Sequence, residues 1–309
     1  MIKKILVTGS LGQLGSYLSK DILEDDKEVI GLDNRINKLS DDLDNINKIT
    51  IKGDICDEKI VNGILDDVDA IVHCAAQVSV EKSLDNPRYD AENNIIGTIN
   101  LLQAAVKSSS VKRFIYVSSA AIYGNSIELP ISENHPLNPL SAYGLSKFTG
   151  EKYVNMFWQI HRLPTVVIRP FNIYSKRADP KSPYSGVISK FIGQVKVNKP
   201  PIIEGDGNQT RDFIHVKDVV QMILLALEKK EAAGEVFNCG CGKPTSINEL
   251  ADIVIKASGK KFKPVYTKER KGDIKYSYAD IKKAKDLLNF KPNVRLEEGL
   301  KELVDFNTM

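Results

Sequence analysis

The chain has 309 residues, which is more than one small core needs, so we expect a large α/β domain with a smaller companion. Its 43 basic and 40 acidic residues are scattered along the chain and leave a formal net charge of +3. Because the chain has no basic tract and no long apolar run, we expect it neither to bind nucleic acid nor to insert into a membrane.

The N-terminal segment and the cysteines indicate where the protein works. The first apolar run, residues 5–7, is only a strand long and is soon followed by Gly9, so no signal peptide is predicted. Four cysteines are too few for a disulfide framework, and Cys239 and Cys241 have no second Cys or His pair to complete a metal site. We therefore expect a cytoplasmic protein with reduced thiols and no metal.

Short β-branched runs alternate with longer amphipathic stretches along most of the chain. The pattern predicts strands at residues 5–7, 28–32, 48–52, 70–74, 113–118, 165–169 and 235–239, and helices at residues 12–24, 58–65, 94–108 and 143–161. Strands that are apolar on both faces and alternate with helices are typical of a buried parallel sheet. Because crossovers between parallel strands are right-handed, the expected fold is a doubly wound α/β sheet of the Rossmann type.

The alternation ends after about residue 169. Residues 170–183 have the composition of a loop, two prolines at positions 200–201 interrupt the chain, and only short strands separate the later helices. We expect residues 1–170 to form the nucleotide-binding domain, with residues 214–240 returning to it. Residues 171–213 and 241–309 then form a smaller mixed α/β domain that binds the substrate.

The first strand-to-helix junction carries glycines three residues apart, at Gly9, Gly12 and Gly15. Without Cβ atoms a diphosphate can approach the backbone, and the helix N-terminus offers it free amide donors. Asp33 follows at the end of the second strand, where an acid binds ribose hydroxyls and favours NAD over NADP. Arg35 argues against that preference, and the glycine spacing departs from the usual fingerprint, so a tight turn without a ligand stays open.

Tyr143 and Lys147 lie four residues apart and share one face if a helix begins there. A free tyrosine has a pKa of about 10, and a fixed positive charge beside it lowers that pKa toward the range useful for a base. The same spacing is also common on solvated helix faces. The pair therefore indicates proton transfer only together with the nucleotide-binding motif.

Further matches extend along nearly the whole chain. They comprise residues 8–15, 33–34, 53–55, 73–77, 94–98, 118–124, 143–147, 169–172, 205–213 and 270–273. With these segments in this order, the chain resembles an extended short-chain dehydrogenase/reductase, in particular the nucleotide-sugar 4-epimerases of the UDP-galactose epimerase type.

The resemblance implies a role for three residues in catalysis. Tyr143 is the base that takes the proton from the sugar 4-hydroxyl while hydride moves from C4 to the nicotinamide, and hydride then returns to the other face of the rotated 4-keto sugar. Lys147 holds the nicotinamide ribose and lowers the pKa of the phenol. Ser119 hydrogen-bonds the reacting oxygen, with Ser118 as a competitor for that role.

The resemblance also implies the contacts to the cofactor, NAD. Expected at the diphosphate are Gly9, Gly12, Gln13, Leu14 and Gly15; at the ribose Asp33 and Asn34; at the adenine Asp54 and Ile55; along the cleft Ala75, Ala76, Gln77 and Asn94; and near the nicotinamide Ser118, Tyr143 and Lys147. The small alanines leave room for a dinucleotide, although close packing of a helix on the sheet would also explain them.

On the substrate side, the resemblance implies that Arg211 and Arg270 bind the diphosphate of a UDP-sugar. Asn172 is expected to bind a phosphate and Asp273 the nucleoside ribose, while Ser119 and Tyr143 contact the sugar. Where enzymes restricted to glucose and galactose often have a bulky tyrosine, this chain has Ser277.

The small side chain of Ser277 implies space for an N-acetyl group. The neighbouring Tyr276 or Tyr278 could instead fill that space, and the sequence leaves both readings open.

A sugar 4,6-dehydratase would carry Asp-Glu after the catalytic hydroxyl, and a decarboxylase a nearby glutamate, where this chain has Ala120 and Ala121. The expectation is therefore an NAD-dependent UDP-sugar 4-epimerase of galactose metabolism, acting on UDP-glucose and UDP-galactose and on their N-acetylhexosamine forms. A UDP-glucuronate 4-epimerase, another enzyme acting on nucleotide sugars, and a non-catalytic NAD-binding regulator are the alternatives. A homodimer through the helices at 94–108 and 143–161 is implied as well.

Overall fold

The computed structural model describes residues 2–35, 44–177, 186–270 and 272–306. Within these ranges, seven parallel strands form the main sheet in the order β11-β6-β5-β4-β1-β2-β3. These strands are β1 (Lys4–Thr8), β2 (Glu28–Asp33), β3 (Thr50–Lys52), β4 (Ala70–His73), β5 (Arg113–Val117), β6 (Thr165–Pro170) and β11 (Val236–Cys239). The strand order reverses direction between β1 and β4, which confirms the predicted doubly wound parallel sheet.

The sheet is buried on both faces because its strands carry consecutive apolar residues. In β1, Ile5 and Val7 point into the core on one face, whereas Leu6 points into the core on the other. All three side chains are fully buried. The continuous apolar run in the sequence is thus the direct cause of a sheet that needs helices on each side.

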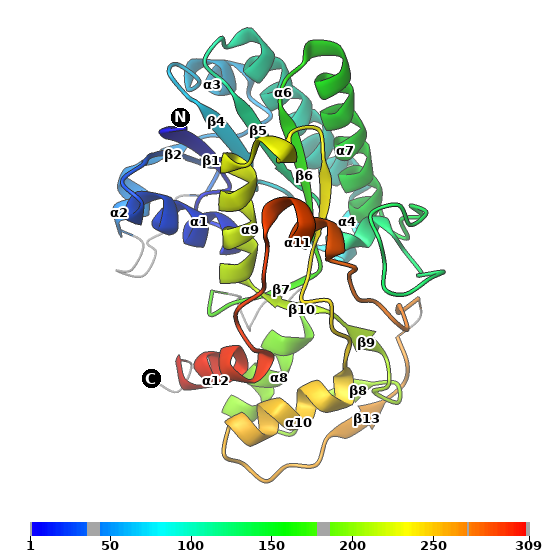
Figure 1. Ribbon diagram of the computed structural model, residues 1–309. Coiled ribbons are helices and arrows are strands. Elements are labelled where there is room, and N and C mark those ends of the chain that lie inside the picture. Colours follow the sequence, from blue (N-terminus) through cyan, green and yellow to red (C-terminus); the bar gives the residue numbers. More distant parts are fainter. Residues whose placement is uncertain (1, 36–43, 178–185, 271, 307–309) are drawn as a thin grey trace.

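Helices cover the two faces of the sheet (Figure 1). On the face of Ile5 lie α1 (Gln13–Glu24), α9 (Val216–Glu228) and α11 (Lys282–Leu288). On the face of Leu6 lie α3 (Glu58–Gly63), α6 (Gly97–Lys107) and α7 (Ala142–His161). The short α2 (Asp44–Lys48) contacts α1. Through Ala284 and Leu288, α11 packs against the main core.

The helix predicted at residues 94–108 begins earlier than expected. It is preceded by α4 (Val80–Asp85) and α5 (Pro87–Ala91), and a π-helical segment, η2 (Glu92–Ile96), joins α5 to α6. Asn86 caps α5 by accepting a hydrogen bond from the Tyr89 amide, and Pro87 occupies the first turn. π-helical segments are frequent at functional sites, and Asn94, a predicted cofactor contact, lies within this one.

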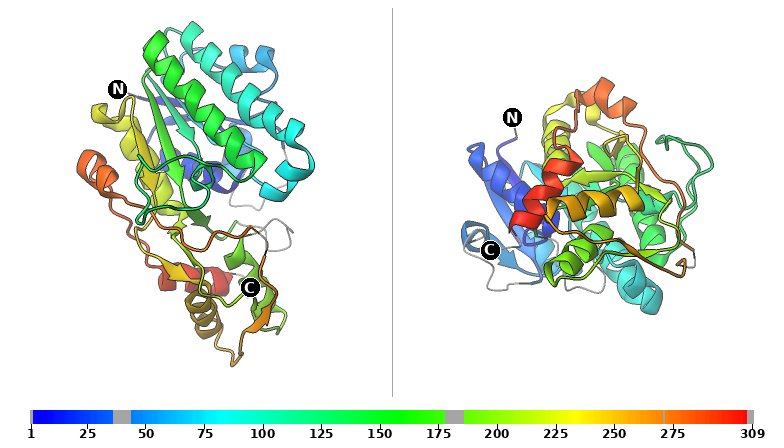
Figure 2. Two further views of the ribbon diagram at one scale, coloured as in Figure 1. Left: turned by 90° about the vertical axis from the view of Figure 1, so that its right-hand side faces the viewer. Right: turned by 90° about the horizontal axis from the view of Figure 1, so that it is seen from below.

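Below the main sheet lies a smaller group of helices and short strands (Figures 1 and 2). Its strand pairs are β7 (Asn172–Tyr174) with β10 (Phe213–His215), β8 (Ile202–Glu204) with β13 (Val265–Thr267), and β9 (Thr210–Arg211) with β12 (Thr245–Ser246). Its helices are α8 (Val187–Lys196), α10 (Ile247–Ala257) and α12 (Leu296–Phe306), which enclose a separate apolar cluster. These short sheets confirm a mixed α/β C-terminal part, while the two-domain division with its boundaries stays a prediction.

Two single turns of 3-10 helix complete the described elements, η3 (Ala120–Ile122) after β5 and η4 (Lys230–Ala232) before β11. In the part of the chain that the structure describes, no helix is both long enough and apolar enough to cross a membrane.

Candidate active site

The residues predicted to act together follow the carboxyl ends of neighbouring strands. The glycine turn follows β1, Asp33 ends β2, and Ser118 and Ser119 come directly after β5. In an open parallel sheet these ends share one edge, and ligands bind there beside the point where the strand order reverses. The fold therefore brings residues from distant parts of the sequence to one place.

The glycine turn after β1 packs tightly. Gly9 has a φ of +67° and its amide donates to the Leu32 carbonyl at 2.7 Å. A Cβ added to Gly9 would lie 2.9 Å from the backbone of Ala75, and one added to Gly15 would overlap the Gly9 carbonyl. Gly12 precedes α1 without any side-chain cap, so the first amides of this helix remain available to an anion.

The carboxylate of Asp33 holds this turn in place. Its Oδ2 accepts from the Leu11 amide at 3.0 Å, and its Oδ1 accepts from the Arg35 amide at 3.0 Å and from Arg35 Nε at 3.4 Å. Asp33 is buried, whereas Arg35 is largely exposed. Asp33, which favours NAD over NADP, and Arg35, which argues against that preference, thus form an ion pair. The carboxylate of Asp33 lies at the end of β2.

Tyr143, Lys147 and Ser119 lie together at the same edge. Ser141 caps α7 by accepting from the Gly144 amide, and the Tyr143 amide donates to Ser83 Oγ at 3.0 Å. The Tyr143 phenol is hydrogen-bonded to the side chain of Ser119. Lys147 Nζ is buried and donates to the Val117 carbonyl, the last residue of β5, at 2.8 Å.

The electrostatics of this group differ from the expectation. Burial raises the pKa of Tyr143; the hydrogen bond to Ser119 opposes that shift, and the nearby charge of Asp90 adds to it. Burial likewise lowers the pKa of Lys147 to about 8, although Cys74, Asp90 and Glu151 oppose the shift. The net shift of the Tyr143 pKa is thus upward, because burial outweighs the hydrogen bond from Ser119, and a lowering of this pKa by Lys147 stays a prediction.

Asn94 and Gln77, both predicted to contact NAD, are hydrogen-bonded to each other. Asn94 Oδ1 accepts from the Gln77 amide at 2.8 Å, and Asn94 Nδ2 donates to the Gln77 carbonyl at 3.0 Å. The same Nδ2 lies 3.2 Å from Asp90 Oδ1 and 3.0 Å from Ser146 Oγ, which joins η2 to α7. Sequence reasoning missed Asp90 and Ser146; the only signal for Asp90 is its position one turn before Asn94.

Asp54 and Ile55, predicted at the adenine, follow β3. Asp54 Oδ1 accepts from the Cys56 amide at 2.9 Å, and Ile55 is buried beneath Gly97, where an added Cβ would overlap its side chain. Contact of these two residues, and of Leu14, Asn34 and Ala76, with the cofactor stays a prediction.

Arg211 and Arg270, predicted at the substrate diphosphate, are held in different ways. Arg211 donates to Asp273 Oδ1 at 2.5 Å and to the carbonyls of Thr210 and Ile274 at 2.8 and 2.6 Å. Arg270 donates to Glu81 Oε1 at 2.8 Å, and both of these side chains are about half exposed. Since Glu81 lies on α4, this pair links residues 189 apart in the sequence.

Ser277 and Asn172 lie close to the segments that carry these arginines. Asn172 Nδ2 donates to the Asp212 carbonyl at 3.1 Å. Ser277 is buried, whereas the adjacent Tyr276 is half exposed and forms a bridge with Thr210. Whether Tyr276 or Tyr278 fills the space beside Ser277 stays an open prediction.

Comparison with known proteins decides the family. Residues 5–240 match the model of the NAD dependent epimerase/dehydratase family. The chain belongs to this family. A Methanocaldococcus jannaschii protein that carries the provisional name UDP-glucose 4-epimerase is 41% identical, over 98% of this chain and 97% of its own length.

Two solved structures support the same assignment. The Thermotoga maritima UDP-glucose 4-epimerase with UDP-glucose has a TM-score of 0.93 and 36% identity, with 99% of this chain and 98% of that one covered. The Methanobrevibacter ruminantium UDP-N-acetylglucosamine 4-epimerase in complex with UDP-N-acetylmuramic acid has a TM-score of 0.93 and 35% identity, with the same coverage. The chain is therefore an NAD-dependent enzyme of the epimerase/dehydratase family that modifies nucleotide sugars.

The residues at the sheet edge fit NAD, the cofactor of this family. Among the described residues, Ser118 Oγ and Gln13 Nε2 are buried without a hydrogen-bond partner, and both belong to the predicted cofactor contacts. Such buried polar atoms are nearly always paired in proteins, so these two are suited to a polar ligand. Together with the uncapped N-terminus of α1 and the carboxylate of Asp33, they match the needs of a dinucleotide.

Proposed function

We propose that the protein is a UDP-sugar 4-epimerase that interconverts UDP-glucose and UDP-galactose and also accepts their N-acetylhexosamine forms. The observation that carries this proposal is the hydrogen-bonded pair of Tyr143 and Ser119 beside the buried ammonium of Lys147. Two partly exposed hydroxyls side by side at the edge where ligands bind suit proton transfer at one sugar oxygen.

Each residue of this group has a defined task in the proposed reaction. Ser119 hydrogen-bonds the sugar 4-oxygen, and Tyr143 takes the 4-hydroxyl proton and later returns it. Lys147, with a pKa of about 8, stays mostly protonated at neutral pH and supplies a positive charge. When bound, NAD supplies the reversible hydride acceptor at C4 and a positively charged ring, whose sign lowers the pKa of a neighbouring phenol.

The short turn after Ser119 supports epimerisation over dehydration. Elimination across C5 and C6 requires an acid and a base near those carbons, but Ala120 and Ala121 have no ionisable groups. Acceptance of N-acetylhexosamines is supported by the small buried Ser277 and by the exposure of Tyr276, half of whose surface is open to solvent.

The decisive variant is Tyr143→Phe. We expect interconversion to fall by about 10²- to 10⁴-fold, because the general base is removed, while NAD remains bound. Purified enzyme is incubated with UDP-glucose, UDP-galactose, their N-acetylamino forms and UDP-glucuronate, and the products are identified by NMR.

Tyr266→Phe is the matched control, because this phenol is exposed and its hydroxyl donates to Asn248 Oδ1 at 3.0 Å. Wild-type turnover by Tyr143→Phe would defeat the mechanism. Turnover of UDP-glucuronate alone would replace the proposed substrate.

A further inference from the structure

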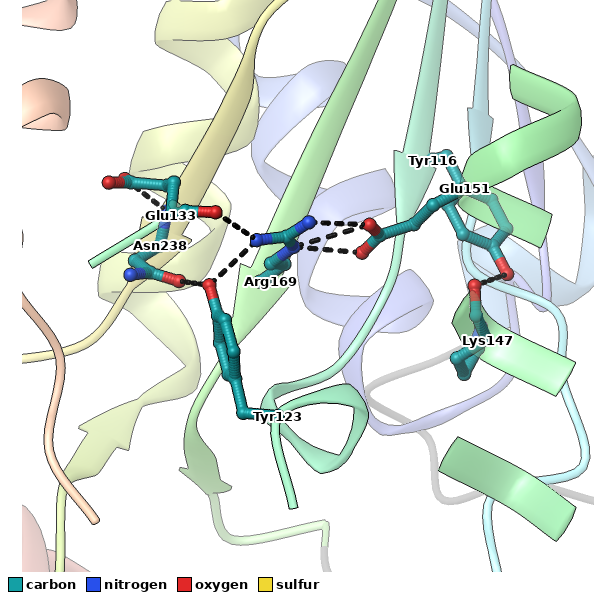
Figure 3. Close-up of polar contacts among 7 residues, drawn as sticks. All are labelled: Tyr116, Tyr123, Glu133, Lys147, Glu151, Arg169 and Asn238. Carbon is teal, nitrogen blue, oxygen red and sulfur yellow. Dashed lines mark hydrogen bonds and ion pairs between the residues drawn. The ribbon is translucent and has the colours of Figure 1, made fainter. Parts of the chain in front are cut away.

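Arg169 is a buried cation at the end of β6, and its guanidinium contacts several separate segments (Figure 3). Nε and Nη2 donate to the two carboxylate oxygens of Glu151, with shortest distances of 3.0 Å and 2.7 Å. Nη1 donates to the Tyr123 hydroxyl at 2.8 Å and to the Glu133 carbonyl at 3.0 Å. One side chain thus joins β6 to α7, to the segment after η3 and to the loop at Glu133.

The contact with Glu151 fixes the helix that carries two of the proposed catalytic groups. Glu151 lies on α7, one turn after Lys147 and two turns after Tyr143. Tyr116 of β5 donates its hydroxyl to the Lys147 carbonyl at 3.4 Å, and a Cβ at Gly150 would overlap that hydroxyl. The helix therefore lies directly on the sheet here, and the carboxylate of Glu151 ties it to Arg169 of β6.

The contact with Tyr123 fixes the turn that carries the third group. Tyr123 follows Ser119 by four residues, with only η3 between them, and it is buried. Its hydroxyl accepts from Arg169 and donates to Asn238 Oδ1 of β11 at 2.6 Å (Figure 3). The ring therefore anchors the end of the Ser119 turn to two strands of the sheet.

A buried ion pair is a poor means of adding stability, because the loss of solvation offsets most of the attraction. Packed apolar residues of the same volume often stabilise a protein as well or better. What the guanidinium supplies in addition is direction, since its planar fork fixes the angles of every acceptor around it. At this position it holds the helix with Tyr143 and the turn with Ser119 at one mutual distance.

We propose that Arg169, acting through Glu151 and Tyr123, is a positioning residue that keeps the Tyr143 phenol and the Ser119 hydroxyl in hydrogen-bonding register. This inference rests on the proposed function, in which these two hydroxyls act on the same sugar oxygen. Neither Arg169 nor Glu151 needs to touch the substrate or the cofactor for this role.

The first test compares Glu151→Gln, Arg169→Lys and Tyr123→Phe by steady-state kinetics of the NAD-loaded enzyme, well below each variant's melting temperature. Glutamine keeps the size of Glu151 but loses its charge, and lysine lacks the planar fork with which Arg169 makes its bidentate contact with Glu151. We expect kcat to fall about 10- to 100-fold for the first two, with KM for the UDP-sugar within about threefold of wild type. Tyr123→Phe should cost less.

Glu235→Gln is the control, because it removes a partly exposed ion pair with Lys283 at the amino end of β11. It should leave kcat unchanged. Wild-type kcat in folded Glu151→Gln, with only a lower melting temperature, would overturn the positioning role and leave a purely structural one.

A second measurement needs no substrate and so separates this inference from the proposed function. The phenolate absorbance of each protein is titrated against that of the same protein carrying Tyr143→Phe, and the difference isolates Tyr143. Because the Ser119 hydrogen bond lowers the pKa of Tyr143, its loss in Glu151→Gln should move the titration to higher pH. Removal of a negative charge alone would move it to lower pH, so an unchanged or lowered titration contradicts the proposal.

Discussion

Arg211 and Arg270 are the same residue type, but they differ in burial and in the contacts of their guanidinium groups. Arg211 has three acceptors, two of them backbone carbonyls, and is mostly buried. Arg270 is half exposed, and the carboxylate it contacts belongs to a distant helix. If both arginines bind the diphosphate as predicted, Arg211 is already oriented by its acceptors, whereas a diphosphate on Arg270 would compete with Glu81.

This competition predicts an unusual gain of affinity in Glu81→Gln. A half-exposed ion pair contributes at most about 1 kcal/mol, so removing it should tighten the binding of UDP by up to about fivefold. Calorimetric titration of the NAD-loaded enzyme with UDP measures this, and the gain should shrink at high salt. Glu92→Gln, which breaks the exposed pair with Arg88, is the control. Unchanged UDP affinity in Glu81→Gln would show that the Glu81 carboxylate does not compete with UDP for Arg270.

At the scale of elements, His73 joins two strands and a helix in the core of the sheet. On β4, its Nδ1 lies 2.8 Å from Thr8 Oγ1 of β1, and its Nε2 lies 3.0 Å from Thr98 Oγ1 of α6. The ring is fully buried, and burial lowers the pKa of His73 to about 3. The native protein therefore holds this imidazole neutral well below pH 6.5.

The shifted pKa of His73 predicts a loss of stability in acid. Above about pH 6.5 both states carry a neutral ring; as the pH falls toward 3 only the unfolded state binds the proton. The contribution to the free energy of unfolding falls by roughly 2 kcal/mol between pH 6.5 and pH 4.5. Urea unfolding at both pH values measures it, with His73→Gln as the comparison. Equal acid sensitivity of the two proteins would rule out this histidine as the cause.

At the scale of the whole molecule, α6 and α7 run side by side on one outer face (Figure 2). Leu145, Met156 and Ile160 form an exposed apolar stripe on α7, and Val106 is exposed on α6. Their spacing on α7 places them on one side of the helix. An apolar stripe of this kind is consistent with the homodimer implied by the sequence, which stays a prediction.

The dimer is tested by sedimentation. We expect a dimer at micromolar concentration and a shift to monomer in Ile160→Glu, because a charge on the stripe loses its water on association. Val197→Glu places the same charge at an exposed position on the end of α8 and should leave the dimer intact. A wild-type protein that sediments as a monomer would contradict the expected interface.

Much of the architecture was readable from local patterns. Alternating apolar runs predicted the parallel sheet and the return of β11, and the glycines at 9, 12 and 15 marked the turn after β1. The four-residue spacing of Tyr143 and Lys147 placed both on α7. These features are local, because a strand, a helix face or a tight turn depends on a few consecutive residues.

The sequence by itself therefore determined the fold class, the family and the place of the candidate site. Only the tertiary structure decided how the site is held and charged. It showed that burial raises the pKa of Tyr143 against the expected direction, that Glu81 pairs with Arg270, and that Arg169 joins α7 to the Ser119 turn. Burial and pairing of polar groups depend on contacts between residues far apart in the chain, and no local pattern specifies those contacts.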